Sequence, residues 1–287
     1  MIDQLTRFVR APKGLLFLVF LALLVPAAVA TGAAALAHVA WAVAGAVVVD
    51  LAAGHLTGKD ARRWPSSAIL SGLIVAFVLG VETPVLVAAA VGALASASKY
   101  LFRSRRGHVF NPAGLALLAA VPLFAAGESW WGAFGDLPAA WVVLLVAVGL
   151  LVVDRVNKWP MALSFLGALY GVFTVLAFGH PALVAEMYRA PFIQSSLFLA
   201  FFMLTDPPTS PGKATDQIRM GALAGLVAAT AQLVGLGQVY LLVGLLAVNV
   251  ALTAQRWLDD RRRPLAGGGA VAGAPRGAGN SRLPLVA

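Results

Sequence analysis

The sequence predicts an all-α membrane protein of ten transmembrane helices, built as two inverted five-helix repeats. Composition is the first observation behind this prediction: of 287 residues, 60% are hydrophobic and 11% are charged, and the mean hydropathy is +0.87. A soluble domain has about half apolar and about a quarter charged residues, so a soluble fold is excluded. An internal repeat and an uneven distribution of lysine and arginine are the other two observations.

The internal repeat joins two short apolar segments that lie 124 residues apart. ILSGLIVAFVLGVETP (69–84) aligns with IQSSLFLAFFMLTDPP (193–208), and six of the sixteen positions are identical. One of the identical pairs is Ser71 with Ser195, and an acidic residue is also kept at one position, where Glu82 aligns with Asp206. Both segments stop at prolines, and both are shorter than the roughly twenty residues that a spanning helix needs. Short, interrupted segments in corresponding halves of a chain point to a binding site between the halves.

Ten apolar runs define the predicted spans. Prolines stand at the start of several runs, where the missing N–H costs no hydrogen bond, and glycine and alanine let neighbouring helices approach closely. The first run also resembles a secretory signal ending at Ala28-Val29-Ala30, but we favour an uncleaved span because its removal would break the helix count and the charge pattern. The runs are 14–30, 33–54, 66–81, 84–102, 109–126, 138–153, 160–179, 191–205, 217–234 and 238–253.

Lysine and arginine lie almost entirely on one side of the predicted topology. With the N-terminus in the cytoplasm, twenty fall inside and only Arg189 falls outside, as the positive-inside rule requires. Both termini are then cytoplasmic in a bacterial inner membrane, and the net charge of +9 needs no nucleic-acid partner. Because each half has five spans, the second half enters from the opposite face, which makes the repeat inverted.

The predicted divisions are a cytoplasmic N-terminal arm (1–13), the first repeat (14–126), an external loop (127–137), the second repeat (138–255) and a disordered cytoplasmic tail (256–287).

Polar residues at the cytoplasmic ends of the spans form the candidate cofactor site. Cations, hydroxyls and free N–H groups at broken helix ends suit an anionic or polar ligand. A second interpretation is open, in which Arg103, Arg105 and Arg106 only fix the topology and bind acidic lipid head groups. The candidate cofactor-binding residues are Lys99, Asn111, Asp206, Thr209 and Ser210.

A second set of small or polar residues lies within the two repeated segments, and we expect it at a pore or at the interface between the repeats. Such residues also commonly join helices by hydrogen bonds. Neither a catalytic site nor a metal site is expected, because the chain has no cysteine, only four histidines and no nucleophile or nucleotide-binding motif. Trp130 and Trp131, in the external loop, are expected to anchor at the membrane interface. The interface residues are Ser71, Gly72, Gln194, Ser195 and Ser196.

Four features occur in a characteristic order: SSAILSGLIVAFVL, Lys99, FNPAG and TDPPTSP. Together, over roughly residues 60–255, they resemble the RnfD/NqrB family, whose members are membrane subunits of the Rnf electron-transport complex and of the sodium-pumping NADH:quinone oxidoreductase. The resemblance implies ten helices in two inverted repeats, similar to urea and ammonium channels. It also implies a flavin and electron transfer across the bilayer, coupled to sodium or proton movement.

The chain departs from the family in the external loop. Redox-complex subunits of the family attach FMN through the threonine of a Ser-Gly-Ala-Thr motif there, whereas this loop reads GESWWGAFGDLP (127–138) and has no threonine. Covalent flavin is therefore not expected, and the resemblance leaves FMN or riboflavin bound non-covalently.

Three functions follow as hypotheses. The leading one is a flavin-binding electron-transport subunit that works with redox partner subunits in the lipid bilayer. The second is a channel or transporter that has kept the fold without a redox role. The third is an accessory membrane protein of a biosynthetic cluster. The resemblance implies this because related stand-alone proteins occur in actinobacterial gene clusters, including those for enediyne biosynthesis.

Overall fold

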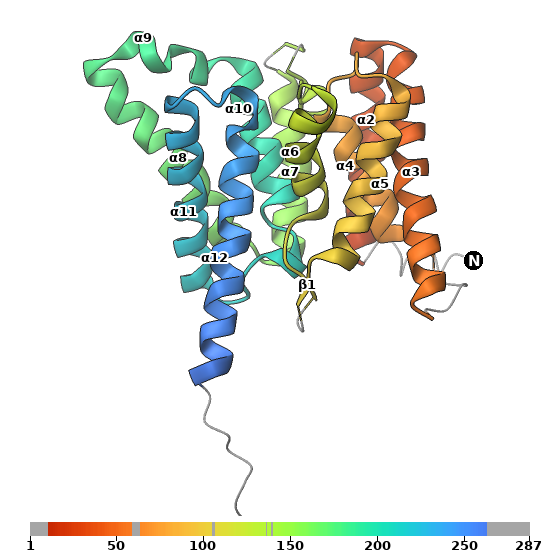
Figure 1. Ribbon diagram of the computed structural model, residues 1–287. Coiled ribbons are helices and arrows are strands. Elements are labelled where there is room, and N and C mark those ends of the chain that lie inside the picture. The colour runs from red at the N-terminus through yellow and green to blue at the C-terminus, as the bar shows by residue number, and fades with distance from the viewer. Residues whose placement is uncertain (1–10, 59–63, 105–106, 136, 139, 263–287) are drawn as a thin grey trace, which may run out of the picture.

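A computed structural model describes residues 11–58, 64–104, 107–135, 137–138 and 140–262. The described chain is a bundle of helices standing side by side. A short antiparallel pair of strands, β1 and β2, each of two residues, lies at one end of the bundle (Figure 1). The main helices are α2 (Pro12–Thr31), α3 (Ala34–Leu56), α4 (Ser66–Val78), α5 (Val85–Leu101), α6 (Pro112–Phe124), α7 (Trp141–Val156), α8 (Trp159–Gly179), α10 (Ala190–Phe198), α11 (Ala214–Leu233) and α12 (Tyr240–Arg262). The short elements are β1 (Arg103–Ser104), β2 (Gly107–His108), η1 (Trp131–Ala133), α9 (Pro181–Val184), η2 (Ala185–Tyr188), the π-helical η3 (Leu199–Met203), η4 (Pro207–Thr209) and η5 (Gly237–Val239).

The helices confirm an all-α membrane protein. Among the described residues, four helical segments are long and apolar enough to cross a membrane, namely α2, α3, α8 and the segment Gly237–Arg261. The apolar segments α4, α5, α6 and Ala190–Met203 are shorter. Each of the ten predicted runs overlaps one main helix. The last helix continues past its predicted end at residue 253 to Arg262, so the first part of the predicted tail is helical.

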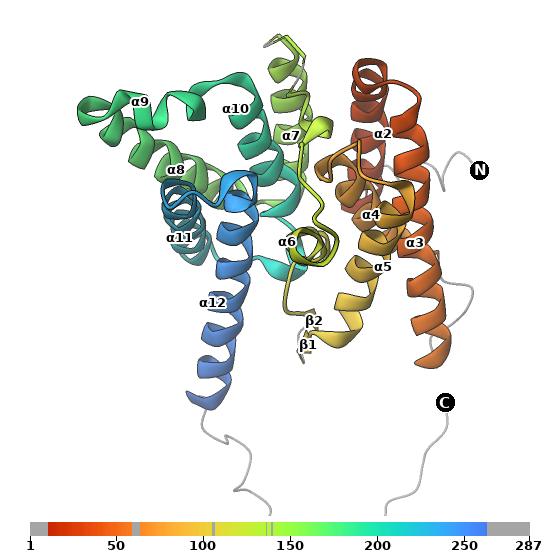
Figure 2. The same cartoon turned by 45° about the horizontal axis from the view of Figure 1, so that its top comes forward.

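Small residues allow the closest helix pairs to form. The most extensive contacts join α3 to α5 and α8 to α11, which are the second and fourth main helices of each half. A Cβ added to Gly92 would lie 2.0 Å from the carbonyl oxygen of Ala42, and one added to Gly221 would lie 2.4 Å from that of Met161. Each glycine therefore lets two backbones touch, as in other membrane helix pairs. In Figure 2, α6 is seen almost end-on between α12 and the α4–α5 pair.

Both repeated segments are interrupted, and the interruptions lie at opposite ends of α6. The α4 helix stops at Val78, and the following Gly80 donates its N–H to the carbonyl of Gly127, just beyond the C-terminal end of α6. The α10 helix runs into a π-helical turn, and the carbonyl of Met203 accepts a hydrogen bond from the side chain of Asn111, at the N-terminal end of α6.

The loop after α6 caps the broken end of α4. Trp131 donates its Nε1–H to the carbonyl of Ala76 at 2.6 Å, and the N–H groups of Ser129 and Trp130 donate to the carbonyl of Val78. Trp130 and Trp131 are only 2% and 3% exposed, so the prediction that they anchor at the membrane interface is wrong. A helix that ends in apolar surroundings leaves carbonyls that must find donors inside the protein, and an indole supplies an N–H together with a large apolar ring.

Aromatic rings fill the centre of the bundle beneath this loop. The ring of Phe77 meets those of Phe20, Trp131 and Phe198 edge to face, with centroids 5.3 to 6.1 Å apart. Phe202 packs against Phe20 and Phe198 in the same way. We call these five rings, from α2, α4, η1, α10 and η3, the aromatic layer.

Replacing Gly92 by alanine should destabilise the fold. The added methyl would overlap the Ala42 carbonyl, and such overpacking costs about 1–3 kcal/mol. Gly171→Ala in α8 is the matched control, because a Cβ there meets nothing within 4 Å. Thermal unfolding of the purified protein in detergent should show a lower midpoint for G92A and an unchanged or higher midpoint for G171A. Equal midpoints would contradict the close α3–α5 contact.

Candidate functional site

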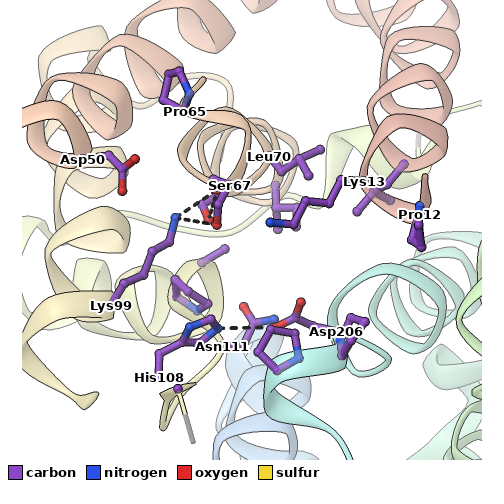
Figure 3. A pocket seen from close by; sticks show the side chains of 18 of the residues that line it. Pro12, Lys13, Asp50, Pro65, Ser67, Leu70, Lys99, His108, Asn111 and Asp206 are labelled. Carbon is purple, nitrogen blue, oxygen red and sulfur yellow. Dashed lines mark hydrogen bonds and ion pairs between the residues drawn. The ribbon is translucent and has the colours of Figure 1, made fainter. Parts of the chain in front are cut away.

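A cavity of about 950 Å³ opens at the end of the bundle that carries the β1–β2 hairpin (Figure 3). Its volume is at the upper end of the range typical of small-molecule sites. One part of the wall is apolar and is formed by Leu16, Leu70, Ile74, Val152, Phe201 and Phe202. The polar and charged part is formed by Lys13, Asp50, His55, Ser67, Ser71, Lys99, Tyr100, Arg103, His108, Asn111, Thr205 and Asp206.

Lys99 extends from the last turn of α5 across the cavity mouth to the first turn of α4. Its ammonium donates to the backbone carbonyl of Ser67 at 2.9 Å and to the hydroxyl of Ser67 at 3.3 Å. Lys13 enters from α2 on the opposite wall (Figure 3). With Arg103, the described wall carries three lysine and arginine side chains, and a concave site lined by basic groups attracts anionic groups.

Two carboxylates, Asp50 and Asp206, also line the cavity. Asp50 accepts a hydrogen bond from the hydroxyl of Tyr100 at 3.0 Å. Asp206 stands just after the break in the second repeated segment, with its Oδ2 3.7 Å from Nε2 of His108 on β2. The hairpin and the broken helix thus meet at one side of the cavity mouth.

Asn111 joins three elements rather than presenting a free amide. Its Oδ1 accepts the N–H of Gly114, which caps α6, and its Nδ2 donates to the carbonyl of Met203. Its backbone N–H donates to Oδ1 of Asn249 at 2.7 Å. Since both ends of the amide are engaged, Asn111 shapes the cavity wall by holding α6, η3 and α12 together.

The carbonyls of the Asp206-to-Pro211 segment are held from behind by side chains. Three prolines prevent regular helix here, so the carbonyls need other donors. Asn249 donates to the carbonyl of Thr209, and Arg256 donates to those of Pro208 and Ser210. The ammonium of Lys158 donates to the carbonyl of Pro211.

The predicted cofactor residues divide into two groups by position. Lys99, Asn111 and Asp206 line the cavity. Thr209 and Ser210 are buried behind its wall, where the Thr209 hydroxyl donates to the Asp206 carboxylate at 3.0 Å.

The predicted interface residues are dispersed. Ser71 lines the cavity, whereas Gly72 packs against the backbone of α3. Ser195 donates to the carbonyl of Pro191, and Ser196 hydrogen-bonds to Tyr170 on α8 at 2.7 Å. The amide of Gln194 is 0% exposed and has no hydrogen-bond partner among the described residues.

Several cavity residues were not predicted from the sequence, among them Lys13, Ser67, His55 and His108. Each lies at or beside the end of a predicted span on the same side as Lys99. That shared position was a usable signal, but Lys13 is 86 positions from Lys99 in the sequence, and no local motif connects them. The cations at 7, 10, 59, 62, 63, 105, 106, 263, 276 and 282, counted in the charge argument, lie outside the described residues.

The cavity wall fits a flavin in its chemistry. An extended apolar surface suits the ring system, and cations at the mouth suit a phosphate or the polar edge of the ring. A metal site has no comparable support, since no group of three or more His, Cys, Asp or Glu gathers among the described residues.

The fold and the cavity define a multi-pass membrane protein with a large cavity whose opening is lined by polar and charged side chains. Residues 127–251 match the sequence model of the NQR2, RnfD, RnfE family. Over these residues the match agrees with the resemblance inferred from the sequence. The match includes the Asp206 segment and excludes Lys99 and Asn111. No curated protein matches the chain.

Replacing Asn111 by alanine should destabilise the protein by about 2–3 kcal/mol, because it leaves the N–H of Gly114 and the carbonyl of Met203 without partners in a buried site. Ser96→Ala is the control, since the Ser96 hydroxyl is buried without a partner among the described residues and its removal should cost little. Chemical unfolding in detergent micelles measures both. An N111A protein as stable as S96A would contradict the role given to Asn111.

Proposed function

We propose that the protein is a membrane subunit for electron transport that binds FMN or riboflavin non-covalently in the cavity and works with redox partner subunits. The observation that carries the proposal is the cavity itself, in which an apolar wall and a mouth with Lys13, Lys99 and Arg103 lie together in a chain whose residues 127–251 match the NQR2, RnfD, RnfE family. When bound, the flavin supplies the electron-accepting and electron-donating chemistry. The chain's own residues bind it, orient it and limit its contact with water.

Lys99 is the residue on which binding would depend most. It already holds two hydrogen bonds to Ser67 at the mouth, so its ammonium is fixed in place rather than free to move. A fixed cation loses less conformational entropy when an anionic or carbonyl oxygen binds beside it. Asp206, paired with His108, would accept a hydrogen bond from a ligand N–H, while Asn111, Thr209 and Ser210 would hold the wall in shape.

We also propose that all ten helices cross the membrane as two inverted repeats, with the cavity end in the cytoplasm. The two interruptions lie at opposite ends of α6, as an inverted pair requires. The ion pair of Arg189 with Glu186 lies in the η2 segment, at the end away from the hairpin (Figure 1). The cations at the cavity then face inside, as the positive-inside rule expects.

Covalent flavin attachment is not part of the proposal. The loop that carries the attachment threonine in relatives is occupied here by Trp130 and Trp131, which cap α4 and pack into the bundle. This loop has a structural role that a threonine could not fill.

A channel is the second candidate, and the unpartnered amide of Gln194 is the observation that favours it. The aromatic layer opposes it, because its five described rings pack against one another in the interior of the bundle and offer no polar groups along a path between them apart from the Trp131 N–H, which the carbonyl of Ala76 accepts. Passage of small polar solutes into liposomes, abolished by Gln194→Leu or Ser71→Val, would decide for a channel. An accessory protein of a biosynthetic cluster would show neither flavin nor flux.

Lys99→Gln should reduce flavin retention. Protein purified from flavin-replete cells should be yellow, and loss of one charge-assisted hydrogen bond, about 1.4 kcal/mol or more, corresponds to about tenfold weaker binding. Lys213→Gln is the control, because Lys213 is exposed and lies outside the cavity wall. Flavin absorbance per mole of protein measures the effect. A colourless wild-type protein would overturn the proposal, and equal retention in both variants would remove Lys99 from the site.

A further inference from the structure

Glu128 is a buried carboxyl at the end of the bundle opposite the cavity. It lies in the loop after α6, where its backbone forms an isolated antiparallel β-bridge with that of Leu79, the residue after the end of α4. The residue is 8% exposed, and neither carboxyl oxygen has a hydrogen-bond partner among the described residues. A carboxylate in such surroundings would be stabilised neither by water nor by protein donors, which makes its ionised form costly.

No cation of the described chain compensates this carboxyl. The charged groups and histidines of the described segments at this end are His38 on α3, Glu82 in the turn after α4, His180 between α8 and α9, and Glu186 and Arg189 in and after η2. His180 is exposed. Arg189 pairs with Glu186 at 2.9 Å, and Glu82 is exposed. His38 is buried and its ring lies near the backbone of Thr83, in the same turn as Glu82. Burial therefore dominates, and it raises the pKa of Glu128 to about 8.

Only a thin layer separates this carboxyl from the cavity. The cavity extends along α4 as far as Ile74, and Leu79, the pairing partner of Glu128, follows five residues later, about 7–8 Å along a helix axis. The ring of Phe77, three residues beyond Ile74 on α4, packs against that of Trp131, three residues beyond Glu128. The described bundle thus has a large cavity at one end and, at the other, a buried acid without a hydrogen-bond partner among the described residues.

We propose that Glu128 is a proton-binding site: its carboxyl holds one proton in the folded protein and exchanges it with solvent at the end opposite the cavity. The ligand is the proton itself, because a sodium ion would need several further oxygen ligands, and no second described carboxylate pairs with Glu128. Binding converts the carboxylate to a neutral acid, and release at alkaline pH returns one proton to the solvent. The site is independent of the flavin proposed for the cavity.

Infrared difference spectroscopy of the full-length protein in lipid nanodiscs tests the proposal. At neutral pH the wild type should show the carbonyl stretch of a protonated carboxylic acid, and the band should disappear with a midpoint near pH 8. The band should be absent from Glu128→Gln and unchanged in Glu82→Gln, which alters an exposed acid at the same end. Labelling wild-type protein with carbon-13 glutamate should shift the band, which keeps the test valid if E128Q folds poorly.

Unfolding provides a second measurement. An acid whose pKa is higher in the folded than in the unfolded protein contributes less stability as pH rises between the two values, here from 4.5 to about 8. E128Q should therefore unfold at a higher temperature than wild type in alkaline buffer, with the difference shrinking toward acidic pH. A band midpoint at ordinary carboxyl pH, a band that survives in E128Q, or a midpoint that sodium shifts but potassium does not would overturn the proposal.

Discussion

Backbone hydrogen bonding at two broken helices governs this structure. Within a bilayer, every N–H and carbonyl needs a partner inside the protein, and the chain interrupts a helix in each half. At the end of α4 the partners come from Trp131 and its neighbours in the following loop. At the end of α10 they come from Asn111, Asn249 and Arg256, which hold the Met203-to-Ser210 backbone. Both breaks are stable because groups distant in the sequence, from the loop after α6 at one break and from α6 and α12 at the other, take over the role of the next helical turn.

The two solutions have different consequences. The tryptophan cap is apolar apart from its N–H, and the Trp131 ring is part of the aromatic layer. The cap at α10 is polar, and with the lysines and carboxylates nearby it leaves a wide, charged mouth. The same kind of helix break thus produces an apolar end beside a buried acid, Glu128, and a polar end with a cavity. This asymmetry, more than any single residue, shapes the proposed electron-transport role.

Much of the fold was predictable from sequence because it follows from composition and periodic interruption. Ten apolar runs, the 124-residue repeat and the prolines after Glu82 and Asp206 located the helices and both breaks. The site was less predictable. Lys99 and Asp206 were found because they stand at span ends, but Asn111 and Thr209 bind their neighbours instead of facing the cavity with free groups. Trp130 and Trp131 were misassigned, since sequence alone cannot distinguish an interfacial indole from one that caps a broken helix.

The central claim is that the two breaks face opposite sides of the membrane, and site-directed cysteine labelling tests it most directly. The chain has no cysteine, so Glu82→Cys and Lys213→Cys can each be made as single-cysteine proteins at exposed positions beside the two breaks. A membrane-impermeant maleimide added to intact cells, with the outer membrane opened where one is present, should label E82C at once and K213C only after the inner membrane is permeabilised. Labelling of both from the same side would contradict the inverted arrangement.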